Sequence, residues 1–464
     1  MSLNRSGRWL VDEQGRVVIL HGFNMVNKLP PYRPDAIGFD EAHAAFIAEQ
    51  CFNTVRLGII WKALEPDPAT YDDGYIDRIG ETVSTLGRAG IHVLLDFHQD
   101  MYNERFNGQG APDWAVQDDG IRAWPDIGFP GNYAVMRALW RAYDHFWAND
   151  PGPGGVGLQD RYAAAWRHVA ERFQDEQAVV GYDIFNEPFP GSAVVRCVRP
   201  AGYPTFDRRL SEFSRRILAA IRQVDDRRLV FYEPNVLFDY GADTHHADLG
   251  DHAVGFSFHA YSAAASPGMP HLPVRLQDMA SRWQEQRVFD LAERHSRTAG
   301  TALLLSEFGA TDDLHAVKRA ADLADRNMVS WQYWAYWNRD PCCERPEEGL
   351  IHDLSQPPSG SNVKEAKLDV LARPYPRAVA GTPRHFAFDG DSGAFQMTYS
   401  TQTPDGQVTG AGSETEVLLP ERHYPHGYAV GASGAEVTSA PNERVLKLVA
   451  KPGQGSVAVR VERA

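Results

Sequence analysis

Residues 181–188 read GYDIFNEP, and the predicted fold of this chain is organised around them. The apolar residues of this stretch predict a buried β-strand, and the strand stops at Glu187 because the proline that follows cannot donate to a sheet ladder. A second apolar stretch, TALLLSEFG at residues 301–309, delivers Glu307 to the end of another strand in the same way. Two glutamates placed like this predict an enzyme that works with a pair of carboxylates.

Strands of this kind alternate with helical segments over most of the chain. Apolar strands are expected to begin near residues 17, 53, 91, 178, 229, 254, 301 and 330, the first running from 17 to 23 and the last from 330 to 337. Amphipathic helices are expected between them, for example at residues 75–89, 158–173, 206–224 and 283–296. Such alternation is typical of a parallel sheet, and eight units predict a (β/α)8 barrel, the TIM barrel. Residues 101–132 interrupt the pattern with a long segment rich in Gly, Pro and aromatic residues, which favours an ordered, functional loop.

The composition changes beyond residue 373. Short strands are expected at residues 394–399, 416–419, 444–449 and 456–461, separated by Gly, Pro and Asp and without helices between them. This pattern predicts a C-terminal antiparallel β-sandwich. We therefore expect two domains, a catalytic barrel of residues 1–373 and a sandwich of residues 374–464.

Charge and length limit the classes of function. The chain has 464 residues and a net charge of −15, which argues against nucleic acid as a partner because phosphate backbones are bound by surplus Lys and Arg. No apolar run approaches the length of a membrane span. Residues 1–15 show no secretory signal, which indicates a cytoplasmic protein or a mature form whose signal has been removed.

The four cysteines are too few for a disulfide scaffold in a chain of this size. Cys51 precedes a strand and is expected to be a buried free thiol. Cys342 and Cys343 are adjacent and either of them can pair with Cys197, a question that the sequence leaves open. No metal site is expected, because no Cys or His pair has the spacing of metal ligands.

In a barrel of this type, polar residues at the carboxyl ends of the strands converge on one face. The residues so placed are Arg56, His98, Asp100, Asn186, Glu187, Glu233, His259, Tyr261, Glu307 and Trp337. Such a set suits glycoside hydrolysis, which needs a proton donor and a nucleophile or base, roughly 5 Å apart in the retaining case. Arg56 is expected to keep the nucleophile ionised, Asn186 to bond a sugar hydroxyl, and Trp337 to offer a flat apolar face to a pyranose.

Four motifs together resemble glycoside hydrolase family five, in clan A: Val-Arg-Leu at residues 55–57, Asn-Glu-Pro at 186–188, His-Ala-Tyr at 259–261 and Glu-Phe-Gly at 307–309. The resemblance covers the barrel and implies net retention of anomeric configuration without a metal or an organic cofactor. It makes Glu187 the acid/base and Glu307 the nucleophile. The supporting residues that it implies are Arg56, His98, Asn186, His259, Tyr261 and Trp337.

Further segments are similar to the endoglycoceramidase branch: GFNMVNK at residues 22–28, FHQDMY at 97–102, GAPDWA at 110–115 and FWAND at 146–150. That branch cleaves the β-linkage between glycan and ceramide in glycosphingolipids, and its members carry a C-terminal β-sandwich. The resemblance implies that Lys28 and Asp100 bind the glycan. The long aromatic loop after Asp100 then fits an apolar channel for the lipid. Much of this branch is secreted, although relatives inside cells act on glucosylceramide or sterol glucosides.

The sequence therefore predicts a retaining β-glycosidase that acts on a glycolipid, as a monomer with transient contact to a membrane or micelle surface. The alternatives are an exo-acting glucosylceramidase or steryl-β-glucosidase, a cellulase-like endo-β-glucanase, and a catalytically silent carbohydrate- or lipid-binding protein, against which both glutamates argue. Glu233 also follows a strand, but without the Asn or Phe-Gly context of the other two, so we expect a structural or substrate-binding role. Trp334 competes with Trp337 as the sugar platform, and strand alternation favours Trp337, with Trp334 in packing.

Overall fold

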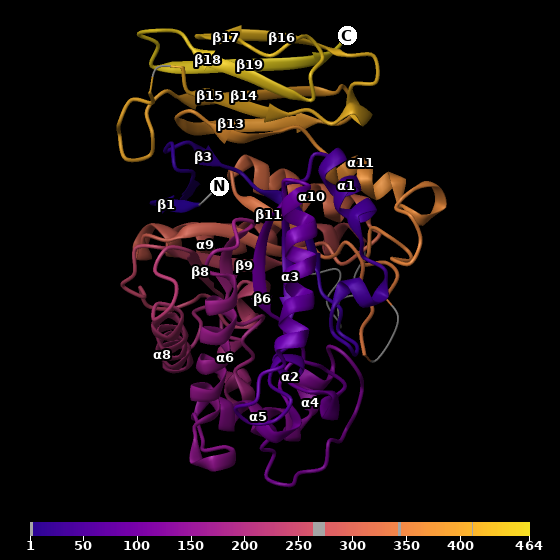
Figure 1. Cartoon of the computed structure of the whole chain (residues 1–464), viewed down its shortest axis with the longest axis vertical. Coiled ribbons are helices and arrows are strands. Elements are labelled where there is room, and N and C mark those ends of the chain that lie inside the picture. Colours follow the sequence, from indigo (N-terminus) through magenta and orange to yellow (C-terminus); the bar gives the residue numbers. More distant parts are fainter. Residues whose placement is uncertain (1–2, 263–273, 342–344, 411) are drawn as a thin grey trace.

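A computed structural model describes residues 3–262, 274–341, 345–410 and 412–464 (Figure 1). Within them, eight parallel strands form a closed barrel in the order β10-β11-β4-β5-β6-β7-β8-β9. Their bounds are β4 His21–Met25, β5 Thr54–Ile59, β6 His92–Phe97, β7 Val179–Asp183, β8 Leu229–Tyr232, β9 Val254–Ala260, β10 Ala302–Phe308 and β11 Ser330–Tyr333. The predicted (β/α)8 barrel is confirmed.

Helices surround the barrel, and the long helices bury an apolar face. Helix α3 (Asp73–Arg88) buries Ile76, Ile79, Val83 and Leu86 on one face. Asp72 caps its first turn by accepting a hydrogen bond from Tyr75 N–H at 2.9 Å. The other helices are α1 Glu41–Glu49, α2 Trp61–Leu64, α4 Asn132–Val135, α5 Arg137–Trp147, α6 Leu158–Phe173, α7 Val194–Cys197, α8 Pro204–Ile221, α9 Val274–Ala299, α10 Leu314–Arg326 and α11 Glu365–Leu371. No helix among the described residues is long and apolar enough to cross a membrane.

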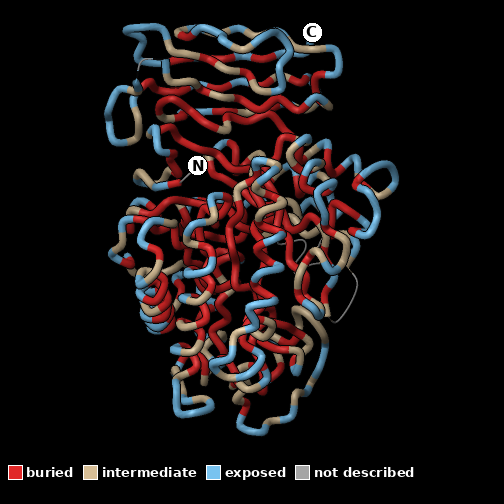
Figure 2. The backbone as a smooth tube through the Cα atoms, in the orientation of Figure 1, coloured by how far each residue is buried: buried red, intermediate tan, exposed pale blue. Residues whose placement is uncertain are grey.

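The C-terminal region is the predicted antiparallel sandwich. One sheet has the order β1-β2-β3-β12-β15-β18-β17 and the other β13-β14-β19-β16. The bounds are β1 Asn4–Ser6, β2 Trp9–Val11, β3 Val17–Val18, β12 Tyr375–Val379, β13 Thr382–Asp389, β14 Ala394–Ser400, β15 Glu414–Leu418, β16 Tyr428–Ser433, β17 Ala435–Val437, β18 Val445–Ala450 and β19 Ser456–Arg463. Figure 2 shows buried backbone inside the barrel and between these two sheets.

The start of the chain belongs to the sandwich sheet and not to the barrel. The single strand expected from residue 17 to residue 23 is two strands in different sheets: Val17 and Val18 pair with Val379 and Ala378, and the barrel begins only at His21. The chain crosses from one sheet to the other in between. The division into domains at residues 373 and 374 stays a prediction. The strand pairings place β1, β2 and β3, within residues 4–18, in the same sheet as β12 of the C-terminal region.

The sandwich packs against the amino-terminal end of the barrel strands. Tyr375 stacks on His21 at the start of β4, with ring centroids 3.8 Å apart, and its hydroxyl donates to the Cys51 carbonyl at 2.9 Å, just before β5. Arg422 donates to the Gln50 side chain at 3.1 Å in the same region. The carboxyl ends of the strands therefore lie at the far end of the molecule from the sandwich, the lower end in Figure 1.

Two elements have other bounds than the sequence predicts, and two of the four cysteines lie among the described residues. Strand β11 ends at Tyr333, earlier than the expected residue 337, and α9 begins at residue 274, earlier than the expected residue 283. Cys51 is a buried free thiol, as expected, and Cys197 is also buried and free. Cys342 and Cys343 lie outside the described residues.

Candidate active site

Arg56 on β5 is the centre of the polar cluster at the carboxyl ends of the strands. The side chain is fully buried, and a buried cation is stable only where carboxylates and hydrogen bonds compensate for the lost water. Its partners are Asp183 at 2.9 Å from Nε, Glu307 at 2.7 Å and Asn24 at 3.1 Å from Nη1, and Asn186 at 3.0 Å, Glu233 at 2.9 Å and Asp96 at 3.0 Å from Nη2. Four carboxyl groups thus share one guanidinium. Burial raises the pKa of Asp183 to about 8 in spite of Arg56.

Glu307 lies near the end of β10, and both of its oxygens accept strong hydrogen bonds. Arg56 Nη1 donates to Oε1 at 2.7 Å, and the Tyr261 hydroxyl donates to Oε2 at 2.6 Å. Burial raises the pKa of Glu307, while His259 and Arg56 act against this by favouring the charged form. The two donors hold the carboxylate in one orientation, as a nucleophile requires.

Glu187 follows β7 in a backbone conformation that non-glycine residues rarely adopt, with φ at 43°. Its N–H donates to Glu233 Oε2 at 2.8 Å, and its carbonyl accepts a hydrogen bond from Gln99 Nε2 at 3.2 Å. The Glu187 side chain is 13% exposed, against 4% for Glu307. The loop therefore points Glu187 toward solvent, where it can meet a leaving group.

The two glutamates share a neighbour, His259 on β9. Its Nδ1 lies 3.0 Å from Glu187 Oε1 and 3.5 Å from Glu307 Oε2. The two oxygens cannot be further apart than these distances together. This limit on these two oxygens is compatible with the roughly 5 Å between the carboxyl groups of retaining glycosidases.

Glu233, for which the sequence predicts a structural or substrate-binding role, accepts two hydrogen bonds within this cluster. Oε1 accepts a hydrogen bond from Arg56 at 2.9 Å, and Oε2 accepts the Glu187 N–H at 2.8 Å. Burial acts to raise its pKa, but His259 and Arg56 outweigh burial and the net pKa is lowered. Glu233 is thus a carboxylate that braces the Glu187 loop.

Asn186 is also engaged at both ends of its side chain. Its Oδ1 accepts a hydrogen bond from Arg56 at 3.0 Å, and its Nδ2 donates to the Gln99 carbonyl at 3.0 Å. Gln99 is not among the site residues predicted from the sequence, although it lies between His98 and Asp100 directly after β6. Its side-chain amide in turn donates to the Asn186 carbonyl at 2.8 Å, which ties the ends of β6 and β7 together.

A second polar group surrounds Lys28, beyond the end of β4. Lys28 Nζ lies 2.8 Å from Asp100 Oδ2 and 2.7 Å from Asp340 Oδ1, and all three side chains are buried. His98 Nδ1 lies 2.8 Å from Asp96, and its Nε2 lies 3.5 Å from Asp100. Burial alone would lower the pKa of His98, but the two carboxylates raise it to about 9. Lys28 and His98 hold the pKa of Asp100 well below its ordinary value in spite of burial, which opposes them.

The aromatic ring beside this group belongs to Trp334. It stacks on His98 with centroids 5.1 Å apart, and Lys28 Nζ lies 4.4 Å from the ring centroid. Its Nε1 donates to Glu348 at 2.8 Å, and burial raises the pKa of that carboxyl to about 7. Trp337 is partly buried against the barrel core. The alternation of faces along a strand does not extend to Trp334 and Trp337, because β11 ends at Tyr333. The sequence feature that favours Trp334 as the ring beside the polar group is its position directly after the strand.

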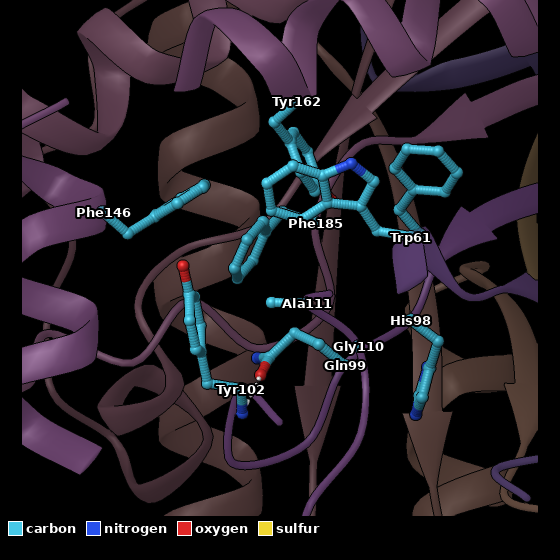
Figure 3. Close-up of a pocket in the computed structure, with 10 residues that line it drawn as sticks. Trp61, His98, Gln99, Tyr102, Gly110, Ala111, Phe146, Tyr162 and Phe185 are labelled. Atoms are coloured by element: carbon cyan, nitrogen blue, oxygen red, sulfur yellow. Dashed lines mark hydrogen bonds between the residues drawn. The ribbon is translucent and has the colours of Figure 1, made fainter. Parts of the chain in front are cut away.

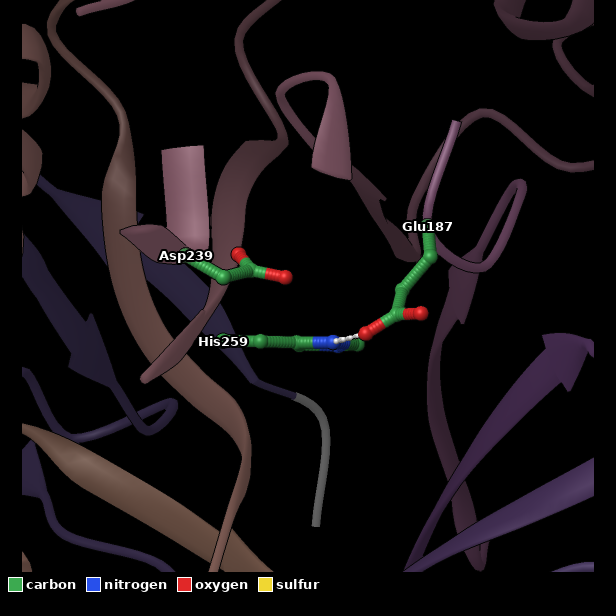
Figure 4. Close-up of side chains that lie close together, drawn as sticks. All are labelled: Glu187, Asp239 and His259. Carbon is green, nitrogen blue, oxygen red and sulfur yellow. Dashed lines mark hydrogen bonds and ion pairs between the residues drawn. The ribbon is translucent and has the colours of Figure 1, made fainter. Parts of the chain in front are cut away.

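Asp239 is a further buried carboxyl group near the site, and no motif of the sequence predicts it. It lies in the short helix η6 (Val236–Tyr240) after β8 and is 3% exposed. It lies close to Glu187 and His259 (Figure 4). One carboxylate oxygen of Asp239, one of Glu187 and one ring nitrogen of His259 all lie within 4.8 Å of one another.

The first part of the loop after β6 borders a small cavity beside the site. Tyr102, Gly110 and Ala111 line a cavity together with Trp61, Phe97, His98, Gln99, Phe146, Tyr162 and Phe185 (Figure 3). This cavity of about 10 Å³ has room for roughly one water molecule. It is therefore too small for the lipid channel expected from the loop.

A barrel whose strand ends carry two close carboxylates, one of them held by an arginine and a tyrosine, is the framework of a retaining glycoside hydrolase. Residues 11–340 match the cellulase model, glycosyl hydrolase family 5, and residues 373–461 match the glycoside hydrolase family 5 C-terminal domain. The chain belongs to glycoside hydrolase family 5.

Similarity to individual members extends over the whole chain. Endoglycoceramidase I of Rhodococcus hoagii is 31% identical, over 100% of this chain and 88% of the relative. An endoglycoceramidase of Hydra vulgaris is 27% identical over 97% of this chain and 86% of the relative. The structure of endo-glycoceramidase II from Rhodococcus sp. in complex with ganglioside GM3 has a TM-score of 0.81 at 28% identity, and the match covers 99% of this chain and 100% of that one. The resemblance drawn from the motifs is confirmed.

The contact between Tyr261 and Glu307 generates a pH prediction. A hydroxyl that donates to a carboxylate favours the ionised form, so Tyr261→Phe raises the pKa of Glu307. For a reaction that needs ionised Glu307, the acid limb of kcat/KM moves to higher pH by about one unit, and the maximum falls at least about tenfold. The measurement is a pH profile on an aryl β-lactoside. Tyr333→Phe, whose hydroxyl donates to the Thr311 carbonyl at 3.3 Å, is the control and leaves the limb in place.

Proposed function

We propose that this glycoside hydrolase cleaves the β-bond between the glycan and the ceramide of glycosphingolipids, with release of the intact glycan. The observation that carries the proposal is full-length similarity to endoglycoceramidases, at 31% identity over 100% of the chain for the relative from Rhodococcus hoagii. The similarity includes the sandwich, and a solved relative is a ganglioside complex.

In the proposed first step, a Glu307 oxygen forms a bond to the anomeric carbon while the bond from that carbon to the ceramide oxygen breaks. Glu187 donates its proton to this oxygen, and ceramide leaves as an alcohol. In the second step, Glu187 takes a proton from water as the water oxygen attacks the anomeric carbon. The ester bond to Glu307 breaks, and the glycan is released with its original configuration.

The remaining residues have supporting roles in this proposal. Arg56 and Tyr261 orient the Glu307 carboxylate, as their distances of 2.7 Å and 2.6 Å support. His259 contacts both glutamates. We assign glycan binding to Lys28, His98, Asp100 and Asn186, because buried charged and amide groups suit sugar hydroxyls. The sugar platform is assigned to Trp334 in preference to Trp337, on its contacts with His98 and Lys28.

Contact with a membrane or micelle surface is also part of the proposal. Large exposed apolar side chains lie on the connections that follow β6, β7, β8 and β9, which are adjacent strands in the barrel. We call these residues the apolar rim: Trp124, Ile127, Val195, Val198, Tyr240, Leu276, Met279 and Trp283. The start of α9 belongs to this end, since Ser281 bonds Ser262 at 2.8 Å. Because the net charge is −15, attachment to lipid would depend on apolar contact and not on attraction to anionic headgroups.

The substrate assignment is tested with glucosylceramide, lactosylceramide and longer gangliosides, followed by mass spectrometry of the products. We expect free ceramide and intact oligosaccharide, because the bond next to the lipid is the one cleaved. Release of glucose alone would favour the exo-acting alternative. Turnover of cellulose oligomers without turnover of any lipid would contradict the glycolipid assignment.

The roles of the two glutamates predict different substrate dependence for their amide variants. Glu307→Gln loses activity by about a thousandfold or more on every substrate, since it removes the nucleophile. Glu187→Gln loses activity on glycolipid, but it still forms the glycosyl-enzyme from a 2,4-dinitrophenyl lactoside, whose leaving group needs no proton. Burst kinetics separate the two cases. Glu65→Gln changes a buried glutamate that accepts a hydrogen bond from Trp61 at 2.8 Å, outside the site, and is the control.

The apolar rim predicts a defect that is confined to lipid surfaces. Trp124 and Trp283 are each 66% exposed, so the double variant Trp124→Ser/Trp283→Ser should fold normally. We expect roughly tenfold slower hydrolysis of lactosylceramide in phosphatidylcholine vesicles and an unchanged rate on a soluble aryl lactoside. Val408→Ser, at a site 75% exposed in the sandwich region, is the matched control. Equal rates of hydrolysis in vesicles for the double variant and the control would contradict a role of the apolar rim in contact with lipid surfaces.

A further inference from the structure

Gln99 lies directly after β6, and its side-chain amide makes four hydrogen bonds. Its Nε2 donates to the carbonyls of Asn186 at 2.8 Å and Glu187 at 3.2 Å. Its Oε1 accepts from the Tyr102 N–H at 3.0 Å and from the Tyr143 hydroxyl at 2.5 Å. The amide cannot be turned round, because its oxygen would then face two carbonyl oxygens. The side chain is 5% exposed, so these bonds give it a single orientation.

The contacts of Gln99 fall on the two peptide groups that flank the Cα atom of Glu187. In the group before it, the Asn186 carbonyl accepts from Gln99. The Glu187 N–H of the same group donates to Glu233 at 2.8 Å. In the group after it, the Glu187 carbonyl accepts from Gln99, and Pro188 has no N–H to add. Gln99 therefore holds both peptide groups around Glu187, whose φ of 43° persists only where neighbouring contacts fix the backbone.

Two other segments hold Gln99 in its turn. Tyr143 belongs to α5, and Tyr102 belongs to the loop after β6, where its own φ is 69°. Gly110 lies further along this loop, and a Cβ atom there would lie only 2.4 Å from the Cβ atom of Gln99. Figure 3 shows Gln99 beside Tyr102 and Gly110. The position of Gln99 is thus set by α5 and by the loop after β6, and its amide passes this position on to Glu187.

We infer that Gln99 is a positioning residue for the proton donor: its amide holds Glu187 at the place from which the carboxyl group protonates the leaving oxygen. This role of Gln99 rests on the proposed role of Glu187. A proton donor is effective only within hydrogen-bond reach of its acceptor, so a displaced Glu187 loses rate. The nucleophile is independent of this amide, because Arg56 and Tyr261 hold the two oxygens of Glu307. Loss of the amide should therefore impair proton donation and spare nucleophilic attack.

The test compares two leaving groups in Gln99→Met, which keeps the length of the side chain and removes its hydrogen bonds. Ceramide needs a proton as it leaves, whereas 2,4-dinitrophenolate does not. We expect kcat/KM to fall about a hundredfold on lactosylceramide in detergent micelles and to stay nearly unchanged on 2,4-dinitrophenyl lactoside. A purely structural role of Gln99 would lower both values by the same factor.

Gln159→Met is the matched control. Gln159 on α6 is 4% exposed, and its Nε2 also donates to two successive carbonyls, those of Phe146 at 2.9 Å and Trp147 at 3.3 Å. These carbonyls lie at the end of α5 and not in the loop of Glu187. We expect Gln159→Met to change kcat/KM on the two substrates by the same factor, because it removes equivalent hydrogen bonds without a contact to the proton donor.

Tyr143→Phe covers the case in which Gln99→Met does not fold. It removes one donor to the Gln99 amide and leaves the amide itself in place, so we expect the same selectivity, with about a fivefold fall on lactosylceramide. An equal fall on both substrates, or no fall on lactosylceramide, in folded Gln99→Met would overturn the inference, as it would in Tyr143→Phe where Gln99→Met does not fold. Glu187→Gln separates this result from failure of the proposed function. If Glu187→Gln itself lowers both activities equally, the role of Glu187 is wrong; a selective loss in Glu187→Gln alone contradicts only the role of Gln99.

Discussion

One buried cation constrains the whole active end of the barrel. Arg56 is fully buried, and an unpaired charge there would cost several kcal/mol, so carboxylates must converge on it from neighbouring strands. Arg56 contacts Glu307 directly and reaches Glu187 through Glu233, which accepts the Glu187 N–H at 2.8 Å. One guanidinium thus sets the position of both glutamates, including the uncommon backbone conformation of Glu187 at φ 43°.

The surplus of acid around this cation explains the protonation pattern of the site. Four carboxyl groups surround Arg56, and His259 is a second base among them. Burial raises the pKa of Asp183 to about 8, so some of these groups keep a proton at neutral pH. A double-displacement reaction needs one acid that first gives and then takes a proton. An environment in which carboxyl groups share protons is suited to that cycle.

The arrangement of the two regions leaves the active end of the barrel accessible. The sandwich lies against the amino ends of the strands, through contacts such as Tyr375 with His21 and Cys51. The opposite end combines a buried polar site with the exposed side chains of the apolar rim. A polar site with exposed apolar side chains on the surrounding loops suits a substrate that has a sugar head and a lipid tail, as the proposed function requires.

The eight strands, the sandwich and the two strand-end glutamates could be predicted from the sequence, because strand periodicity is local and parallel strands bring their carboxyl ends to one face. Three further points depend on contacts between segments far apart in the chain. Val17 pairs with Val379 across most of the chain, a choice among many possible strand partners. The position of Trp334 depends on where β11 ends. Asp239 belongs to no motif, and it meets Glu187 only because a loop folds back over β9, which no local pattern encodes.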